Sequence, residues 1–347
     1  MYLPALYGSR RDAAGNPAWV HLKNRIESLT PNPSGPGVRC EFPFSSRLHA
    51  CDYIPGWSSG LMRRALTDWP IEFSEQLATQ GTPVASFLFA HRGEARLGQL
   101  IQVIKSVFAQ RDVPVEVIVA DLTRPHLGER LPEGVQHLAI DDSHLTPGWR
   151  KAWAFNIAAR QARGRILVFQ DGDICVPRDY AGELIRQFDK HGWQAASLQR
   201  FLFYLDEASM LRVTRENQLV TGGIEAVTQN WKGGTIAIRR DCFFEIGGFD
   251  EGFVDWGGED DEFYDRCGTL RHNRFGYLPF VHLWHPPQAV RKDQPNPNLR
   301  LVTPWRNSMS RESRCAELSQ RDFGQKTSPV PAEAYKETLQ RQAHSAP

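Results

Sequence analysis

The sequence predicts an α/β fold in which helices cover both faces of a mainly parallel sheet. Apolar runs and segments of helical spacing alternate along the middle of the chain, which is typical of such sheets. The 347 residues include 41% hydrophobic and 11% aromatic residues, which suits a globular core. One apolar run ends directly at Asp121, and another runs through Gln170 into Asp171. Ligands of such sheets bind beyond the carboxyl ends of the strands.

The chain divides into three expected segments. Residues 1–82 are interrupted by prolines from Pro4 to Pro70 and show little periodicity, so we expect an irregular N-terminal extension. Residues 83–287 form the expected catalytic domain. Residues 288–347 are rich in arginine and proline and predict a polar, mainly solvated C-terminal segment.

Within residues 83–287, apolar side chains at helical spacing predict helices over 94–108 and 149–163, and a further helix after about Asp179. A long irregular stretch is expected from there through Gln229. Its part from Asp206 to Trp231 fits either a lid over a ligand or a plain surface loop. The expected strands are 84–90, 115–120, 135–140, 166–169 and 233–238.

Charge and cysteine content exclude several classes of protein. Lysine plus arginine number 41 against 40 aspartate plus glutamate, so we expect no nucleic-acid partner. Six cysteines without a CxxC pair favour reduced thiols and a cytoplasmic location. No signal peptide and no transmembrane segment are expected, while peripheral membrane contact and a homo-oligomer stay open.

A pair of aspartates, Asp171 and Asp173, flanks Gly172 after the run 166–169. Strand alternation predicts that both carboxylates face one spot, where they would bind a hard divalent cation. That cation would neutralise a departing diphosphate. The alternative is structural, because aspartates commonly end strands as turn formers.

A second acidic group follows two glycines in Trp256-Gly257-Gly258-Glu259-Asp260-Asp261-Glu262. Acids in a first helical turn are explained by capping and by the helix dipole. One of them would equally serve as general base on an acceptor hydroxyl, and Trp256 offers a flat surface to a sugar ring. The residues alone leave both interpretations open.

The third group is His282-Leu283-Trp284-His285, after an apolar stretch that begins at Phe275. A histidine here would complete a metal site begun by Asp173, and imidazole ligands would shift its preference from magnesium towards manganese. A lone histidine at such a position is more often structural.

The segments VFQDGDICVP, GGTIAIRRDCFFEIGGFDEGFVDWGGEDDEFYDR and HLWH together resemble the GT-A type inverting glycosyltransferases. The likeness covers about residues 84–286. It is greatest to the family-two enzymes of bacterial polysaccharide synthesis, including chondroitin-polymerase-like modules, and to the C-terminal part of the beta-1,4-galactosyltransferases. The resemblance implies a GT-A fold, a Rossmann-like mainly parallel sheet flanked by helices.

For the acceptor and metal sites, the resemblance implies the following roles. Asp260 matches the general base, and Glu259 and Trp256 match residues that orient the sugars. Asp173 and His285 match metal ligands, while Asp171 would contact the donor ribose or the metal. His282 stands where the galactosyltransferases carry methionine, so it is a further candidate ligand.

For the donor site, the resemblance points to a second set of residues. Gly233 and Gly234 match the backbone against the donor sugar and phosphates, and Asp121 resembles the aspartate that binds uracil or ribose. His91 and Arg92 stand near the end of the first strand, where family-two proteins often show different residues. Lys151 is expected to face the nucleotide. Solvated surface positions are the alternative for Asp121 and Lys151.

The expected activity is that of a nucleotide-sugar-dependent hexosyltransferase using Mn²⁺ or Mg²⁺. It would move a sugar from a UDP-linked donor to a hydroxyl of a carbohydrate or glycoconjugate acceptor. The run EDDE lacks the asparagine of the retaining polypeptide transferases, which favours inversion. The alternatives are a metal-dependent nucleotide-sugar hydrolase or phosphoesterase, and a catalytically silent carbohydrate-binding protein.

Overall fold

A computed structural model of the chain describes residues 17–41, 47–229, 233–286, 298 and 308–329. Its centre is a seven-stranded sheet with the order β12-β8-β11-β6-β3-β4-β5. Four of the six pairings are parallel, and only β11 runs antiparallel to its two neighbours. The strands are β3 (Ala85–His91), β4 (Val115–Asp121), β5 (Val135–Ala139), β6 (Ile166–Gln170), β8 (Ala195–Ala196), β11 (Thr235–Arg239) and β12 (His272–Asn273).

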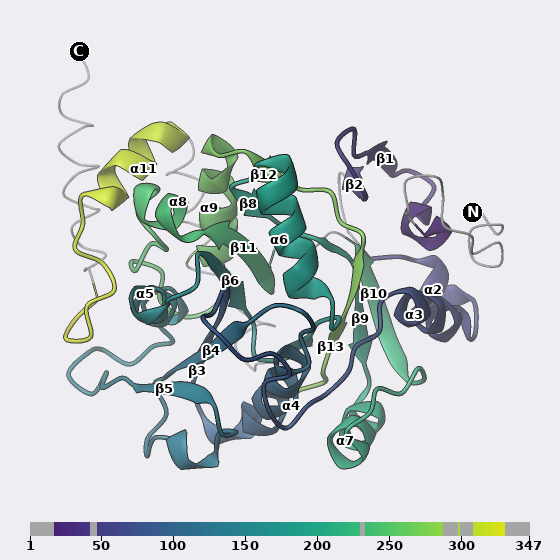
Figure 1. Ribbon diagram of the computed structural model, residues 1–347, viewed down its shortest axis with the longest axis horizontal. Helices are drawn as coiled ribbons and strands as arrows, with labels where there is room; N and C mark the ends of the chain where they lie inside the picture. The colour runs from purple at the N-terminus through teal and green to yellow at the C-terminus, as the bar shows by residue number, and fades with distance from the viewer. Residues whose placement is uncertain (1–16, 42–46, 230–232, 287–297, 299–307, 330–347) are drawn as a thin grey trace.

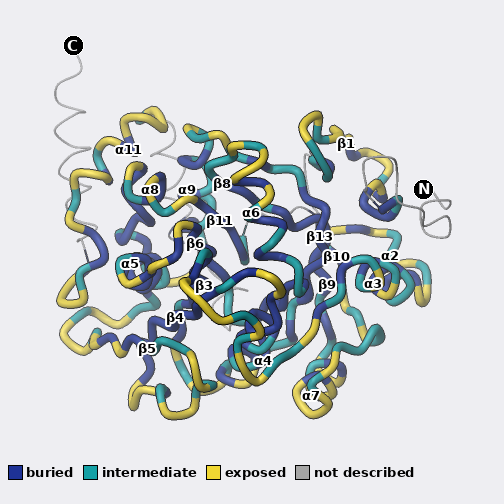
Figure 2. Tube along the Cα trace, viewed as in Figure 1, coloured by how far each residue is buried: buried dark blue, intermediate teal, exposed yellow. Residues whose placement is uncertain are grey.

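Helices cover both faces of this sheet, as predicted (Figure 1). On one face α4 (Leu97–Phe108) and α6 (Tyr180–His191) share a hydrophobic cluster with β3 and β4. On the other face α5 (Lys151–Gln161), α8 (Arg240–Glu245) and α9 (Glu259–Arg266) share a second cluster with β6. Successive residues of the central strands β3, β4 and β6 are almost all buried, so both sides of these strands are covered. Figure 2 shows buried residues in dark blue along this part of the sheet. This burial explains the continuous apolar runs. The mainly parallel α/β fold is therefore confirmed.

A second sheet has four strands in the order β10-β9-β13-β7. It includes much of the stretch for which the sequence predicted irregular structure through Gln229, so that prediction is wrong. The run Phe201-Leu202-Phe203 is buried inside β9, where it contributes to the core. The elements are β7 (Ile174–Cys175), β9 (Gln199–Leu205), α7 (Glu207–Glu216), β10 (Ile224–Gln229) and β13 (Leu278–His282).

The candidate lid from Asp206 to Trp231 is likewise mostly regular within its described part, residues 206–229. Asp206 caps α7 by accepting a hydrogen bond from the backbone N–H of Ser209 at 2.7 Å. The Ser209 hydroxyl donates to the carbonyl of Gly222 at 2.8 Å. The second contact fixes Gly222 to the start of α7. Trp231 lies outside the described residues.

In its described part, residues 17–41 and 47–82, the N-terminal segment is not irregular. It contains a hairpin and three short or medium helices, and no proline lies within the longest helix. Leu61, Met62 and Ala65 form the buried face of that helix. The elements are η1 (Ala18–His21), β1 (Ser28–Pro31), β2 (Val38–Glu41), α2 (Ala50–Tyr53) and α3 (Trp57–Asp68).

A buried arginine fastens this N-terminal segment to the second sheet. Arg200 on β9 has no exposed surface and donates to the carbonyls of Val20 at 2.6 Å and Leu22 at 2.5 Å. It also donates to the side-chain oxygen of Gln229 at 3.0 Å. Residues near Trp19 are therefore part of the same folded body.

The described stretch of the C-terminal segment, residues 308–329, is not a solvated tail. Helix α11 (Arg311–Ser319) packs against α9, and it buries Cys315 and Leu318. Arg314 is buried as well and lies 3.1 Å from Glu262. This arginine of the polar segment therefore forms an ion pair inside the protein rather than facing solvent. Among the described residues no helix is both long and apolar enough to cross a bilayer.

Candidate active site

The two predicted aspartates lie at the carboxyl end of β6 but in a turn. Because the strand ends at Gln170, strand alternation does not govern Asp171 and Asp173. The two carboxylates belong to two adjacent groups of side chains. The expectation that both face one spot is therefore wrong. Leu100 lies 3.2 Å from a β-carbon built on Gly172, so a larger residue between the aspartates would press on α4.

The first group is a candidate metal site made by Asp173, His282 and His285, with one ligand atom from each within 4.8 Å of the others. Oδ1 of Asp173 lies 3.7 Å from Nε2 of His282, and Oδ2 lies 3.3 Å from Nε2 of His285. Strand β13 brings the histidines here, since the N–H of Leu283 donates to the Asp173 carbonyl at 2.8 Å. His282, the weaker candidate from the sequence, stacks on the ring of Tyr204.

The protonation states of this group suit a cation. Burial alone would raise the pKa of Asp173, but His282, His285 and Arg96 outweigh it and lower that pKa to about 2. Burial lowers the pKa of His282, which favours the neutral imidazole that metal ligation requires. One carboxylate with two imidazoles fits a borderline divalent cation better than magnesium.

Arg96 also belongs to this group, although no sequence motif indicated it. It ends the short helix η2 (Glu94–Arg96) in front of α4. Its Nη1 lies 3.4 Å from Oδ2 of Asp173, and its Nη2 lies 3.2 Å from Nδ1 of His285. The partners are 77 and 189 residues away in the chain, so no local motif identifies the contact.

The second group surrounds the ammonium of Lys151, the first residue of α5. Nζ lies 2.8 Å from Asp171, 3.3 Å from Glu259 and 3.1 Å from Asp260. Burial disfavours the ammonium, but the three carboxylates raise the pKa of Lys151 well above its ordinary value. Lys151 therefore binds the acidic residues directly.

Asp260 has the environment of a base that works near neutral pH. Burial raises its pKa, Lys151 opposes that shift, and the neighbouring carboxylates of Glu259 and Asp171 add to it, giving a pKa of about 7. Two glycines start the helix that carries it, and Gly258 has a φ of +91°, which side-chain-bearing residues rarely adopt.

The acids of α9 have different tasks. Glu262 binds Arg266 at 2.7 Å and Arg314 at 3.1 Å, and all three side chains are buried, so Glu262 is structural. Glu259 is also buried, and its Oε2 has no hydrogen-bond partner within the described part of the chain. An orphaned carboxylate oxygen beside Asp260 is a natural acceptor for a ligand hydroxyl.

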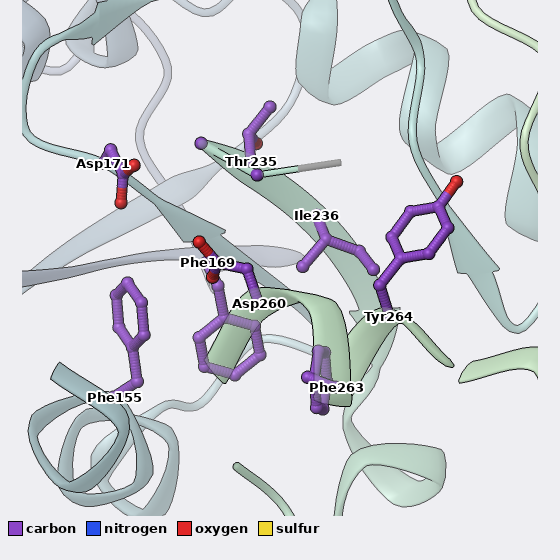
Figure 3. A pocket seen from close by; sticks show the side chains of 10 residues that line it. Phe155, Phe169, Asp171, Thr235, Ile236, Asp260, Phe263 and Tyr264 are labelled. Carbon is purple, nitrogen blue, oxygen red and sulfur yellow. The ribbon is translucent and has the colours of Figure 1, made fainter. Parts of the chain in front are cut away.

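A pocket joins Asp171 and Asp260 across the end of β11, and Figure 3 shows both carboxylates beside it with the rings of Phe155, Phe169 and Phe263. Gly233 and Gly234 form part of its wall. The Gly234 carbonyl accepts from the N–H of Asp171 at 2.8 Å. A β-carbon on Gly234 would lie 2.3 Å from Ile174, so only glycine leaves this wall undisturbed.

The remaining donor-site candidates lie at the carboxyl ends of β3 and β4. Asp121 is buried and accepts from the N–H groups of Thr123 and Leu127, both at 2.8 Å, and it lies 3.0 Å from Nε2 of His137. Burial would raise its pKa, yet these hydrogen bonds lower it. The solvated alternative for Asp121 is therefore wrong, and its carboxylate holds the loop between these partners.

Three further candidates differ in their contacts with the rest of the protein. They are His91, Arg92 and Trp256. His91 is buried with Nε2 unpartnered among the described residues, and burial lowers its pKa. Arg92 donates to the carbonyl of Gly148 and lies 4.0 Å from Asp142. Trp256 is 47% exposed in the loop before α9, where a large aromatic surface is open to a ligand.

Two family models match the part of the chain that forms this site. Residues 94–249 match glycosyl transferase family 2, and residues 223–277 match the model described as the N-terminal domain of galactosyltransferase. Together with the mixed α/β fold, these matches define a GT-A type glycosyltransferase. The chain is a nucleotide-sugar glycosyltransferase with a family 2 domain, as the sequence motifs indicated.

The chain is also similar to several solved structures. One is S. aureus TarS in complex with UDP-GlcNAc, at 14% identity and a TM-score of 0.45, covering 67% of this chain and 71% of that one. Another is the mannosyltransferase PcManGT from Pyrobaculum calidifontis with GDP-Man and Mn²⁺, at 18% identity and a TM-score of 0.40, covering 80% and 84%. A third is the Drosophila beta1,4galactosyltransferase 7 with xylobiose, at 16% identity and a TM-score of 0.37, covering 65% and 82%.

Proposed function

We propose that this glycosyltransferase is metal-dependent and inverting, and that it moves a sugar from a UDP-linked donor to an acceptor hydroxyl. The proposal rests mainly on one juxtaposition. Asp171 and Asp260 line a single pocket, while Asp173, two residues further along the same turn, is one of three clustered metal-ligand candidates. The proposed base and the proposed cation site would thus lie side by side.

The metal would be held by Asp173, His282 and His285. Bound there, Mn²⁺ would supply positive charge that stabilises the departing diphosphate. Two imidazoles in the donor set support manganese over magnesium, although the sequence analysis admitted both. Asp171 does not join this cluster, and its ion pair with Lys151 supports a role at the donor pocket instead.

Asp260 would act as the general base. The acceptor oxygen forms a bond to the anomeric carbon, the bond from that carbon to the diphosphate oxygen breaks, and the acceptor proton goes to Asp260. A single displacement of this kind inverts the anomeric configuration. Lys151 keeps the base partly ionised, because its ammonium opposes the rise in pKa that burial causes.

Glu259 and Trp256 would orient the acceptor. The unpartnered Oε2 of Glu259 accepts a sugar hydroxyl, and the exposed ring of Trp256 stacks on a sugar face. On the donor side, Gly233 and Gly234 would admit the sugar and phosphates. His91 and Arg92 would contact the nucleotide, while Asp121 would act through the loop that it holds.

Calorimetric titration with a panel of nucleotide sugars, with and without Mn²⁺, tests the donor and metal assignments. Wild type is compared with Asp173→Ala. We expect binding of a UDP-sugar that needs Mn²⁺ and is lost in the variant. Binding that does not need metal, or that survives in Asp173→Ala, contradicts the metal assignment.

Product analysis tests the reaction itself. Nuclear magnetic resonance of the product should show inverted anomeric configuration, and sugar release should require an acceptor. Release of free sugar without an acceptor would support the nucleotide-sugar hydrolase. Sugar binding without any nucleotide release would support the silent carbohydrate-binding protein.

A further inference from the structure

Arg96 places a positive charge beside two of the proposed metal ligands. Its two terminal nitrogens lie 3.4 Å from Oδ2 of Asp173 and 3.2 Å from Nδ1 of His285. The same Oδ2 is 3.3 Å from Nε2 of His285. The guanidinium therefore contacts two of the three side chains that would ligate a cation.

The position of Arg96 is fixed by its own helix. Gln99, one turn further on, is buried and donates from Nε2 to the carbonyl of Trp284 at 3.0 Å. This bond ties the start of α4 to the segment that carries His285. Arg96 thus stays near the metal ligands even when its contacts with Asp173 are broken.

A guanidinium and a divalent cation compete for these ligands. Both require the negative charge of Asp173, and two like charges so close repel each other strongly. A cation bound by Asp173, His282 and His285 would therefore displace Arg96, which is about one third exposed and free to turn towards the pocket.

The donor diphosphate offers Arg96 a new partner. Of the two cationic side chains that contact Asp171 or Asp173, Lys151 already lies within 3.3 Å of three carboxylates. Arg96 would lose its carboxylate to the metal and so become available. A guanidinium binds phosphate oxygens through paired hydrogen bonds, which suits this task.

We propose that Arg96 is an exchange residue: it holds the charge of the metal site before the cation binds, and then turns to bind the diphosphate of the donor. This inference rests on the proposed metal-dependent function. It assigns Arg96 two opposite effects, against metal binding in the free protein and in favour of nucleotide binding in the metal-loaded protein.

Two titrations on the full chain test the exchange. Free Mn²⁺ is measured by electron paramagnetic resonance without nucleotide, and UDP binding is measured by calorimetry in saturating Mn²⁺. For Arg96→Gln we expect Mn²⁺ affinity to rise about threefold or more and UDP affinity to fall about tenfold, the loss of one charge-assisted contact. Arg96→Lys, which keeps the charge but cannot form the paired hydrogen bonds, should restore the Mn²⁺ affinity of wild type and only part of its UDP affinity.

Arg165→Gln is the matched control, because Arg165 forms an exposed ion pair with Asp189 before the opposite end of β6. It should leave both affinities unchanged. If Arg96→Gln lowers both affinities or changes neither, while Asp173→Ala still abolishes Mn²⁺ binding, the exchange is wrong and the metal site stands. If wild type binds no Mn²⁺, the metal assignment and the exchange both fail.

Discussion

Nζ of Lys151 lies 3.1 Å from Oδ2 of Asp260, which links the first residue of α5 to the first turn of α9. The lysine lowers the pKa of the aspartate, while burial raises it. The balance leaves Asp260 with a pKa of about 7, where a carboxylate can both accept and release a proton under neutral conditions.

Replacement of Asp260 by asparagine should remove the base and keep the shape. We expect kcat to fall by about 10²- to 10⁴-fold, the usual contribution of general-base catalysis. Mn²⁺-dependent UDP binding should persist, because Asp260 does not belong to the metal-ligand group. Asp261→Asn, at the next position of the same helix, is the control. Full transfer by Asp260→Asn would show that another group accepts the proton.

The rate should rise with pH through the pKa of Asp260, since only the ionised carboxylate accepts a proton. In wild type, kcat/KM at saturating Mn²⁺ should therefore have an acid limb near pH 7. Lys151→Gln removes the charge that lowers this pKa, so its limb should move to higher pH. A melting curve of the variant shows whether it is folded. A limb that stays in place, or moves to lower pH, would refute the role of Lys151.

The two histidines of the metal site should both be required. His282→Ala and His285→Ala should each weaken Mn²⁺ binding at least about tenfold. Substitution of residues that only hydrogen-bond to metal ligands already lowers metal affinity by about this factor, and loss of a ligand should lower it at least as much. His49→Ala, an exposed histidine on the N-terminal segment, is the control. Chelation of the metal by EDTA should abolish UDP-sugar binding by wild type. Unchanged Mn²⁺ affinity in His282→Ala would restrict the site to Asp173 and His285.

The buried ion pairs of Glu262 should contribute strongly to stability. Glu262→Gln leaves Arg266 and Arg314 buried without their shared carboxylate, and breaking such a group costs about 3–5 kcal/mol of unfolding free energy. Urea denaturation measures this loss. Glu312→Gln, on the exposed side of α11, should unfold at nearly the same urea concentration as wild type. Equal stabilities of the two variants would mean that α11 is not held by this pair.

The central fold was predictable because its strands are buried on both sides. The continuous apolar runs of β3, β4 and β6 and the periodicity of α4 survive in the sequence whatever the tertiary contacts are. Helix α3 was missed because nearby prolines dominated the sequence signal, although its buried positions Leu61, Met62 and Ala65 have helical spacing. The buried run Phe201–Phe203 was the signal that β9 offered.

The site was predictable only where its chemistry is local. The acids around Asp260 and the histidines near His285 stand in short motifs. Arg96 stands in none, and its role depends on contacts across 77 and 189 residues. The separation of Asp171 from Asp173 depends on where β6 ends, and the boundaries of elements are the least predictable feature of a sequence.

The anchoring of the N-terminal segment by Arg200 has a consequence for biosynthesis. The carbonyls that it binds precede it by 178 and 180 residues. Trp19 and Val20 are fully buried in the folded protein. On the growing chain, they cannot reach this buried position until β9 has left the ribosome. We expect this delay to make nascent chains of intermediate length dependent on chaperones, and to end when Arg200 emerges.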